Sequence, residues 1–320
     1  MNFRQMSRVA ASLALLLSSA TSLFAQEKVS AFTTKMVSLN SAIQKKHAKW
    51  VAGETSVSQL SPVEWKYLVG FNNLKIKAEP VPEMQSLAAP ASVDWRDKGF
   101  VTPVRDQKKC GSCWAFAMTG ALESNVIIAK DKPSQNLDLS EQVFISCGGV
   151  GSCNGGTLNA DYLVSSGLPP EKYYPYAAVD GDCSSAQAGW EKAAEKIGSW
   201  GSVSAKLSSI KSALAKYGPL PTAMWVYEDF MHYKTGVYSY VSGKKLGGHA
   251  ILLVGYNDGE QYFIVKNSWN TKWGEDGYFK IAYSELTSDV SFGMMTLAYR
   301  PATDLKSIPP RIEPVMMQRP

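Results

Sequence analysis

Cysteine is the residue type in this sequence whose number and spacing most directly suggest chemistry. The five cysteines are Cys110, Cys113, Cys147, Cys153 and Cys183. In an oxidising compartment thiols tend to pair, and an odd number leaves one thiol over. An unpaired thiol in such a protein is a candidate nucleophile for covalent catalysis.

The segment Cys110-Gly-Ser-Cys113 also fits two other kinds of site. A thioredoxin-like redox pair usually has Trp before its first Cys, whereas Trp114 follows the second Cys here. A zinc site would need a second close-spaced pair, but Cys147 and Cys153 are six residues apart and the chain has only three His. We therefore expect no metal and no cofactor, and a redox role for Cys110 and Cys113 stays as an alternative.

A nucleophilic cysteine needs a lowered thiol pKa, a base and a donor for the developing oxyanion. Cys113 begins a segment that is apolar nearly all round, which predicts a buried helix from about Cys113 to Ala129 with Ser112 as its cap. The free N–H groups and the positive end of the dipole at the start of a helix stabilise a thiolate. Cys113 is therefore the expected nucleophile.

The expected base is His249, chosen from the three histidines. His47 lies in the Lys-rich N-terminal part of the chain, and His232 lies in a polar-rich run that is typical of the surface. His249 follows two glycines, which leave room for a substrate backbone, and it opens an apolar strand. An imidazole base needs an orienting hydrogen bond, which the amide of Asn267 can provide.

The N-terminus has the pattern of a secretory signal. Arg4 and Arg8 precede an apolar stretch, Val9 to Leu17, that is too short to span a bilayer. We expect a signal peptide over residues 1–25, cleaved after Ala25 or Ala20. No later apolar run approaches the ~18 residues of a membrane span, so we expect no membrane anchor. The expected location is secreted or periplasmic, with a lysosome or vacuole as the alternative.

Residues 26–90 differ in composition from the rest of the chain. They carry eight Lys against five Glu and no Cys. Ser61 to Trp65 has a helix start signal, and Glu79 to Pro90 is typical of an exposed, cleavable linker. The formal charges of residues 91–320 cancel, so nothing there suggests a nucleic-acid or acidic-membrane partner.

Two kinds of secondary structure follow one another after residue 90. Residues 91–195 are expected to be mostly helical, with a second helix opening at Ser140. From residue 218 the pattern changes to short β-rich runs, among them Ala250 to Tyr256, Tyr262 to Lys266 and Tyr278 to Ala282. A helical half followed by an antiparallel β half predicts an α+β architecture.

These residues belong to motifs that resemble those of the papain family of cysteine peptidases. The motifs, in the family's order from the active-site segment onwards, are Gln107-Lys-Lys-Cys-Gly-Ser-Cys-Trp-Ala-Phe116, Asn154-Gly-Gly156, Gly248-His-Ala250 with Val254-Gly-Tyr256, and Asn267-Ser-Trp269 with Trp273-Gly-Glu-Asp-Gly-Tyr278, preceded by the mature start Val93-Asp-Trp-Arg96. The resemblance covers roughly residues 91–299. It implies a papain-like fold in which a mainly helical subdomain (about 91–200) and an antiparallel β-barrel-like subdomain (about 201–300) flank the active-site cleft. Residues 301–320 are Pro-rich and have no periodicity, so we expect a flexible tail.

The resemblance also implies a role for each catalytic residue. Cys113 matches the nucleophile and His249 the general base and acid, oriented by Asn267 under the indole of Trp269. Gln107 matches the oxyanion-hole donor, which acts together with the N–H of Cys113. The implied reaction is hydrolysis of peptide bonds by a secreted endopeptidase through a thioester acyl-enzyme. A non-catalytic binding protein with the papain fold is the alternative.

The same resemblance implies which residues contact the substrate and which cysteines form disulfides. The implied substrate-binding residues are Gly111, Gly155, Gly156, Thr157, Leu158, Ala223, Gly248, Ala250 and Trp269, with Met294 or Met295 near the base of a pocket. Since none of these is acidic, we expect Leu, Val or Phe in the substrate two residues before the scissile bond. The implied disulfides are Cys110–Cys153 and Cys147–Cys183.

The implied partners are protein or peptide substrates and the chain's own propeptide, in a monomer. The propeptide, residues 26–90, is shorter than the family's usual one and is expected to lie across the cleft until cleaved near Leu87 to Ala91. Among the departures from the family pattern, Lys108 stands where Gly is usual. Together with Lys109 it places positive charge near the leaving-group side, where it would favour acidic residues.

Overall fold

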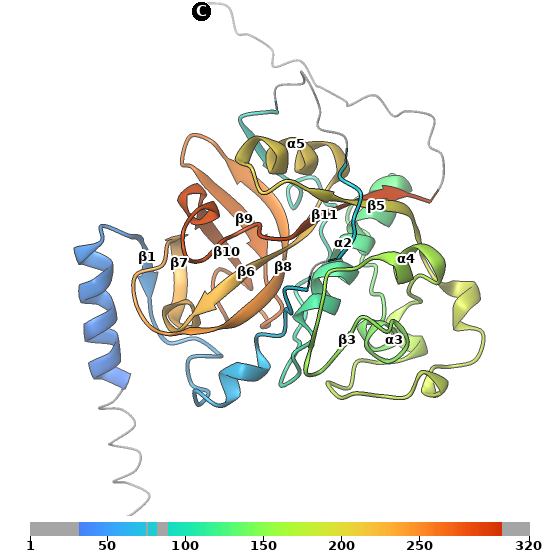
Figure 1. Ribbon diagram of the computed structural model, residues 1–320, viewed down its shortest axis with the longest axis horizontal. Helices are drawn as coiled ribbons and strands as arrows, with labels where there is room; N and C mark the ends of the chain where they lie inside the picture. Colours follow the sequence, from blue (N-terminus) through green and yellow to red (C-terminus); the bar gives the residue numbers. More distant parts are fainter. Residues whose placement is uncertain (1–31, 75, 82–88, 303–320) are drawn as a thin grey trace, which may run out of the picture. The chain divides into compact units, whose positions relative to one another are not determined.

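The computed structural model describes residues 32–74, 76–81 and 89–302 (Figure 1). They fall into two compact units, one that ends at Ala48 and contains a helix over residues 32–45, and one that begins at Lys49. The predicted signal peptide and most of the predicted tail lie outside the described residues. Within them, no helix is both long and apolar enough to cross a membrane.

The larger unit is built on one mixed sheet with the strand order β1-β7-β10-β9-β8-β6-β11-β5, in which β2 also pairs with β8. The strands are β1 (Lys49–Ala52), β2 (Ser92–Asp94), β5 (Ile197–Val203), β6 (Leu220–Tyr227), β7 (Tyr233–Tyr238), β8 (Lys245–Asn257), β9 (Tyr262–Lys266), β10 (Tyr278–Ala282) and β11 (Thr296–Pro301), and β3 (Gly151–Ser152) forms a separate hairpin with β4 (Gly155–Gly156). All pairs are antiparallel except β10 with β7. The described strands do not close into a barrel, so the barrel-like subdomain expected from the sequence is an open sheet.

Helix α2 (Cys113–Ala129) is the central helix and has the predicted bounds. Its residues are buried from Cys113 to Ile127 because it packs against β8 on one side and the loop-rich half of the chain on the other (Figure 1). The sequence predicts Ser112 as the cap of this helix, but the Ser112 side chain makes no capping hydrogen bond. The Ser112 hydroxyl instead lies 2.8 Å from the Tyr176 hydroxyl.

The other helices are short. They are α3 (Glu141–Cys147), α4 (Asp161–Ser165), α5 (Leu207–Tyr217) and the 3-10 turns η1 (Glu64–Tyr67), η2 (Glu171–Tyr173), η3 (Cys183–Ser185), η4 (Trp190–Ala193), η5 (Glu228–His232) and η6 (Tyr283–Leu286). Ser140 caps α3 as predicted, since its Oγ accepts a hydrogen bond from the N–H of Val143 at 3.0 Å. The prediction of a mostly helical stretch over 91–195 was wrong, because loops and single turns held by disulfides occupy much of it.

Residues 49–74 and 76–81 fold as part of the larger unit. Strand β1 adds to β7, and further on Pro80 pairs with Ser202 at the other edge of the sheet. In the view of Figure 1 this blue-to-cyan segment leads from β1 past α2 toward β5. It also covers His232, which is buried at 2% exposure with its ring edge-on to Trp65. The surface position predicted for His232 was therefore wrong.

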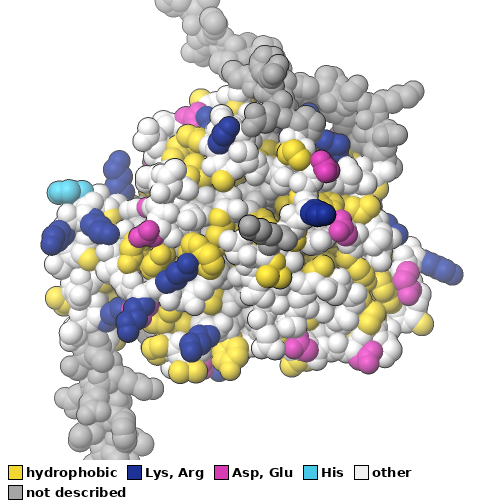
Figure 2. Space-filling model, in the orientation of Figure 1, with side chains coloured by type: hydrophobic (Ala, Val, Ile, Leu, Met, Phe, Trp, Pro, Cys, Tyr) yellow, Lys and Arg dark blue, Asp and Glu magenta, His cyan; other side chains and the backbone are white. Residues whose placement is uncertain are grey.

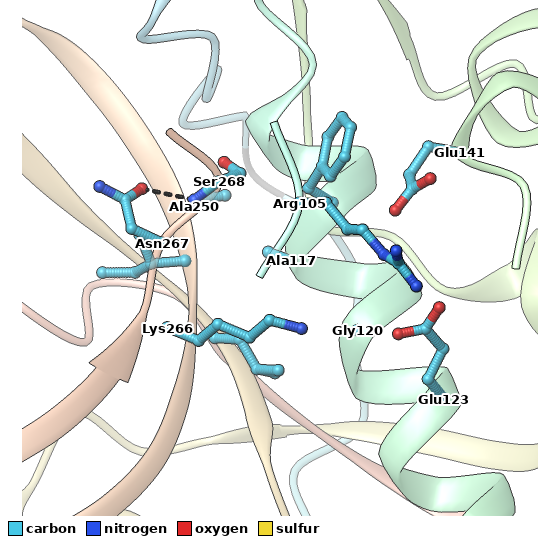
Figure 3. Close-up of a pocket in the computed structure, with 12 residues that line it drawn as sticks. Arg105, Ala117, Gly120, Glu123, Glu141, Ala250, Lys266, Asn267 and Ser268 are labelled. Carbon is cyan, nitrogen blue, oxygen red and sulfur yellow. Dashed lines mark hydrogen bonds between the residues drawn. The ribbon is translucent and has the colours of Figure 1, made fainter. Parts of the chain in front are cut away.

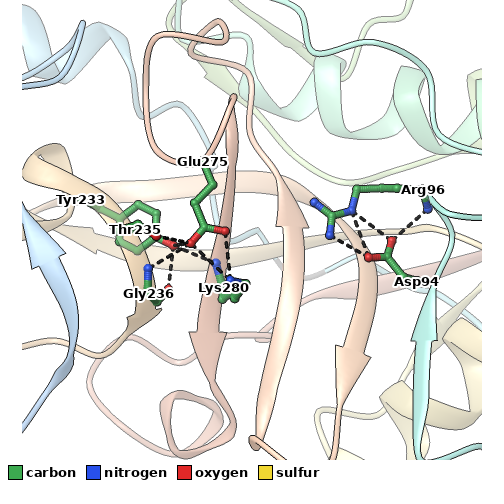
Figure 4. Close-up of polar contacts among 7 residues, drawn as sticks. All are labelled: Asp94, Arg96, Tyr233, Thr235, Gly236, Glu275 and Lys280. Carbon is green, nitrogen blue, oxygen red and sulfur yellow. Dashed lines mark hydrogen bonds and ion pairs between the residues drawn. The ribbon is translucent and has the colours of Figure 1, made fainter.

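Two polar clusters fix loops near the ends of the sheet (Figure 4). Asp94 binds Arg96 through two oxygens, with the Arg96 Nε 3.0 Å from Oδ1. Glu275 accepts hydrogen bonds from the Thr235 hydroxyl at 2.7 Å and the Gly236 N–H at 2.9 Å. Because Glu275 follows Trp273 closely, this second cluster holds the loop whose aromatic rings support the site described below.

Candidate active site

Cys113 is the free cysteine of the chain and lies at the first position of α2. Its side chain is fully buried, and its Sγ accepts a hydrogen bond from the N–H of Ala250 at 3.4 Å. Burial raises the pKa of the thiol to about 11, although backbone N–H groups of Ala250 and Gly70 oppose this. Its place at the helix N-terminus had predicted a lowered pKa for the Cys113 thiol. In this closed site, loss of water outweighs the helix terminus.

His249 lies on β8 opposite the start of α2, and β9 ends just before Asn267. The His249 Nε2 donates to the Asn267 Oδ1 at 2.8 Å, and the Asn267 Oδ1 also accepts from the N–H of Ser268. The indole of Trp269 stacks on the imidazole with a centroid distance of 4.7 Å, so it shields this hydrogen bond from water. Burial lowers the pKa of His249 to about 4, against the opposing effect of Asn267.

Gln107 is buried beside the nucleophile, and its amide is held at both ends. Its Nε2 donates to the carbonyl of Cys110 at 2.9 Å, and its Oε1 accepts from the Ser268 hydroxyl at 2.7 Å. The Tyr176 hydroxyl donates to the Gln107 carbonyl at 2.7 Å. The sequence reasoning missed Ser268 and Tyr176 as supports. The one sequence signal for Ser268 is its position between the motif residues Asn267 and Trp269, and Tyr176 has no such signal.

An extended segment, residues 68–72, lies directly over these groups. The carbonyl of Leu68 accepts from the Gln107 Nε2 and from the Trp269 Nε1, both at 3.3 Å. Gly70 packs so closely that an added Cβ would lie 2.0 Å from the carbonyl oxygen of Gly111. The segment therefore occupies the space in front of Cys113.

The same segment pairs with the backbone of both walls of the site. The N–H of Phe71 donates to the Gly248 carbonyl at 2.9 Å, and the N–H of Asn72 donates to the Gly156 carbonyl at 2.8 Å. The N–H of Gly156 donates in turn to the Gly70 carbonyl at 2.8 Å. These are β-type contacts to an extended chain, which is the contact expected for Gly156.

The remaining residues predicted to contact substrate belong to the core that includes Phe71 or lie beside Gly156 and the first disulfide. Leu158, Ala223 and Ala250 are buried and share one apolar cluster with Phe71, and Ala223 pairs with Ala250 across β6 and β8. Met294 and Met295 are partly buried against this cluster. Thr157 is buried next to Gly156, and Gly155 and Gly111 lie where the two loops meet, since the N–H of Gly111 donates to the Cys153 carbonyl at 2.8 Å. The structure thus brings together the predicted set around one segment of the chain.

A cluster of charged side chains lies between α2 and the sheet, with Glu123, Glu141 and Lys266 buried and Arg105 partly exposed. Figure 3 shows Arg105 and Lys266 reaching from one side toward Glu123 and Glu141 on the other. The Lys266 Nζ donates to the Thr102 hydroxyl at 3.1 Å, and that hydroxyl donates to Glu123. Burial lowers the pKa of Lys266 to about 8 and raises the pKa of Glu123. Asn267 and Ser268 line the same pocket, so the cluster borders the site.

The four other cysteines form the disulfides Cys110–Cys153 and Cys147–Cys183, the pairs that the resemblance implies. The alternative of a redox pair between Cys110 and Cys113 is therefore wrong, because Cys110 is bonded elsewhere and Cys113 is free. Within the described ranges, no group of three or more His, Cys, Asp or Glu side chains is arranged to hold a metal ion. On the face shown in Figure 2, acidic and basic side chains are interspersed among uncharged ones.

Comparison with known proteins gives consistent matches. A family model described as papain family cysteine protease matches residues 89–298. Cathepsin L2 of Homo sapiens is 36% identical over 267 residues, which is 78% of each chain, and a cathepsin L-like proteinase of Fasciola hepatica is 38% identical over 228 residues, 68% of each. The structure of a digestive procathepsin L2 proteinase from Tenebrio molitor larval midgut is similar with a TM-score of 0.74 and 28% identity, covering 85% of this chain and 90% of that one. A recombinant stem bromelain precursor has a TM-score of 0.72 and 28% identity, covering 85% and 89%.

Proposed function

Because the chain belongs to the papain family of cysteine proteases, we propose that it is an endopeptidase in which Cys113 forms a thioester with the acyl part of its substrate. One observation carries this proposal. The free thiol of Cys113 and the Asn267-bound imidazole of His249 lie under a chain segment that is held by Gln107, Trp269 and Gly156 as an extended peptide would be held.

The proposed mechanism uses the thiol as nucleophile, the imidazole as base and acid in turn, and the amides as donors and supports. His249 takes the proton of Cys113 at Nδ1, a buried nitrogen that has no hydrogen-bond partner among the described residues. The sulfur attacks the peptide carbonyl, and the Gln107 Nε2 and the N–H of Cys113 donate to the oxyanion. The imidazolium then protonates the leaving amine. Water hydrolyses the thioester, with His249 taking the proton of that water and Asn267 holding the ring throughout.

We further infer that residues 26–90 are an inhibitory propeptide, cleaved near Leu87 to Ala91. The contacts of residues 68–72 support this, since the segment takes the donors at Gln107, Trp269 and Gly156 that a substrate needs. A secreted or periplasmic location after removal of residues 1–25 remains our proposal, with a lysosome or vacuole as the alternative. The two disulfides are consistent with such compartments.

The apolar cluster around Phe71 supports a preference for Leu, Val or Phe two residues before the scissile bond. Leu158, Ala223 and Ala250 offer no charge partner, so burying an Arg among them would leave its charge uncompensated. A fluorogenic peptide series that varies this position would measure the preference. Equal turnover with Arg would contradict the assignment of the pocket.

The decisive test of the reaction is active-site labelling. An epoxide that alkylates activated thiols should modify the processed protein at a single site and abolish peptide hydrolysis. Cys113→Ala should remove both labelling and hydrolysis while the protein stays folded by circular dichroism. Hydrolysis that survives in Cys113→Ala would overturn the proposed nucleophile.

A further inference from the structure

Two adjacent lysines project from the loop that carries Gln107 and the first disulfide. Lys108 has a positive φ of 52°, and its N–H donates to the Asp106 Oδ1 at 2.8 Å, so the turn is fixed from within. Lys109 is next to the disulfide-bonded Cys110, while its own side chain is 64% exposed. The loop backbone is therefore held in place and the Lys109 ammonium is presented to solvent.

The propeptide places a carboxylate on this ammonium. The Glu64 Oε1 lies 2.7 Å from the Lys109 Nζ, and the other oxygen of Glu64 accepts from the N–H and the hydroxyl of Ser61 at 2.8 and 2.9 Å. Among the described residues, Glu64 is the one carboxylate within ion-pair distance of Lys109. The hydrogen bond from Lys109 lowers the pKa of Glu64 to about 2.

The position of Lys109 relative to the nucleophile follows from the path of the propeptide. Its residues contact Gly156 at Asn72, Cys113 at Gly70 and Gln107 at Leu68, and they then reach Lys109 at Glu64. Gly156 and Lys109 thus lie on opposite sides of Cys113. In the proposed reaction Gly156 binds the acyl part of the substrate, so Lys109 borders the part that leaves.

We propose that Lys109 is a specificity-determining residue that binds a carboxylate on the leaving-group side of the substrate, and that Glu64 occupies this subsite in the unprocessed chain. The inference rests on the proposed peptidase function and names the substrate class for that site: peptides with Asp or Glu one to three residues after the scissile bond. Removal of the propeptide leaves Lys109 with no ion-pair partner in the part of the chain that the structure describes.

The test uses protein activated from the full chain and internally quenched peptides that share one apolar residue before the scissile bond. The residue one, two or three places after the bond is Glu, Gln or Lys, and all peptides end in an amide. A further Gln peptide with a free C-terminal carboxylate distinguishes a side-chain carboxylate from a chain terminus. An exposed ion pair predicts a kcat/KM ratio of Glu to Gln of about two- to fivefold at one position, falling with added salt.

Three variants test the contact between Lys109 and the substrate carboxylate. For each variant the kcat/KM ratio of the Glu to the Gln peptide is compared, so that differences in the fraction of active protein cancel. Lys109→Met should bring the Glu-to-Gln ratio to about one, and Lys109→Glu should invert it in favour of the Lys peptide. Lys108→Met removes the same charge one residue away and serves as the matched control, which should keep the ratio. An unchanged ratio in Lys109→Met, or an equal loss in Lys108→Met, would overturn the proposal.

The same measurements separate this inference from the proposed peptidase function. If the Gln peptide is cleaved by the wild-type protein but Glu gives no advantage, the subsite is refuted and the peptidase function stands. If no peptide is cleaved and the epoxide does not label Cys113, the peptidase function itself fails. Preference for the free terminus over the Glu side chain would also overturn the subsite as stated, because it would place the carboxylate of a chain end on Lys109.

Discussion

The closed form of the protein is the uncut chain with residues 68–72 over Cys113. We expect acid to destabilise this form because His249 becomes protonated. Burial in the covered site lowers the pKa of this imidazole to about 4, from its ordinary value of 6.5. A group whose pKa is lowered on closing favours the closed form above its ordinary pKa, and that contribution is lost as pH falls through the closed-state pKa. The relevant window is therefore pH 6.5 to 4.

The magnitude follows from the same two values. At 1.36 kcal/mol for each pKa unit, protonation of His249 weakens closure by about 3 kcal/mol between pH 7 and pH 4. This is an upper figure, because the Trp269 ring stays stacked on the imidazole when the propeptide leaves. Glu64 acts in a lower window, since its pKa of about 2 makes its contribution disappear only below pH 4.5. His249 therefore dominates in mild acid.

Hydrogen exchange of two propeptide amides provides a direct assay. The N–H groups of Phe71 and Asn72 are bonded to Gly248 and Gly156 across the cleft, so they exchange only when the segment lifts. Using the full chain with Cys113→Ala to prevent processing, we expect the opening free energy at these amides to fall by up to about 3 kcal/mol from pH 7 to pH 4, after correction for intrinsic exchange.

Two variants decide whether His249 is the cause. In His249→Gln the side chain cannot take up a proton, so the pH dependence between 6.5 and 4 should vanish. Glu64→Gln should keep the dependence in that window while lowering protection by a similar amount at pH 7 and pH 5. If the His249→Gln chain loosens with acid as much as its parent, the reasoning from burial of the imidazole is wrong.

Three further outcomes are expected. Gly70→Ala should increase epoxide labelling of the uncleaved chain, because the added Cβ cannot fit against the loop beneath it. Gly259→Ala, where the added Cβ would meet only the Asn257 side-chain oxygen at 3.3 Å, is the control. Ser268→Ala should lower kcat about two- to tenfold with little change in KM, since the amide of the oxyanion hole loses one of its supports; peptide kinetics would show it. Lys266→Met should reduce the free energy of unfolding by about 1–3 kcal/mol in urea titrations, because the buried Thr102 hydroxyl loses its donor and Glu123 loses a nearby cation, and the double variant with Glu123→Gln should recover part of the loss.

Local sequence patterns predicted the elements whose residues are buried whatever the rest of the chain does. The all-round apolar segment gave α2 its observed bounds, and the runs that form β9 and β10 were also placed correctly. These elements carry Cys113 and lead into Asn267, so much of the proposed catalytic geometry could be anticipated. The resemblance to the papain family supplied the pairing of the disulfides, which composition and spacing alone left open.

Contacts between distant parts of the chain account for what the sequence reasoning got wrong. His232 looked like a surface residue because its neighbours are polar, yet Trp65 from the propeptide covers it. The pKa of Cys113 was expected to be low because the helix N-terminus is visible in the sequence, whereas the covering segment at Gly70 is not. Ser112 had the right type and place for a cap, but the Tyr176 hydroxyl lies close enough to engage its Oγ.

The shared use of donors by propeptide and substrate determines how the site opens. The Leu68 carbonyl takes hydrogen bonds from both Gln107 and Trp269, so no substrate can reach these donors until the segment lifts. While the chain is uncut, the segment competes at an effective concentration of about 1 mM or more, which substrates at micromolar levels cannot match. Acid weakens closure by up to about 3 kcal/mol, roughly a hundredfold, and this brings the open state within reach without abolishing the competition. Cleavage of the linker is then what converts inhibition into dissociation, because only a separate propeptide can be diluted away from the cleft.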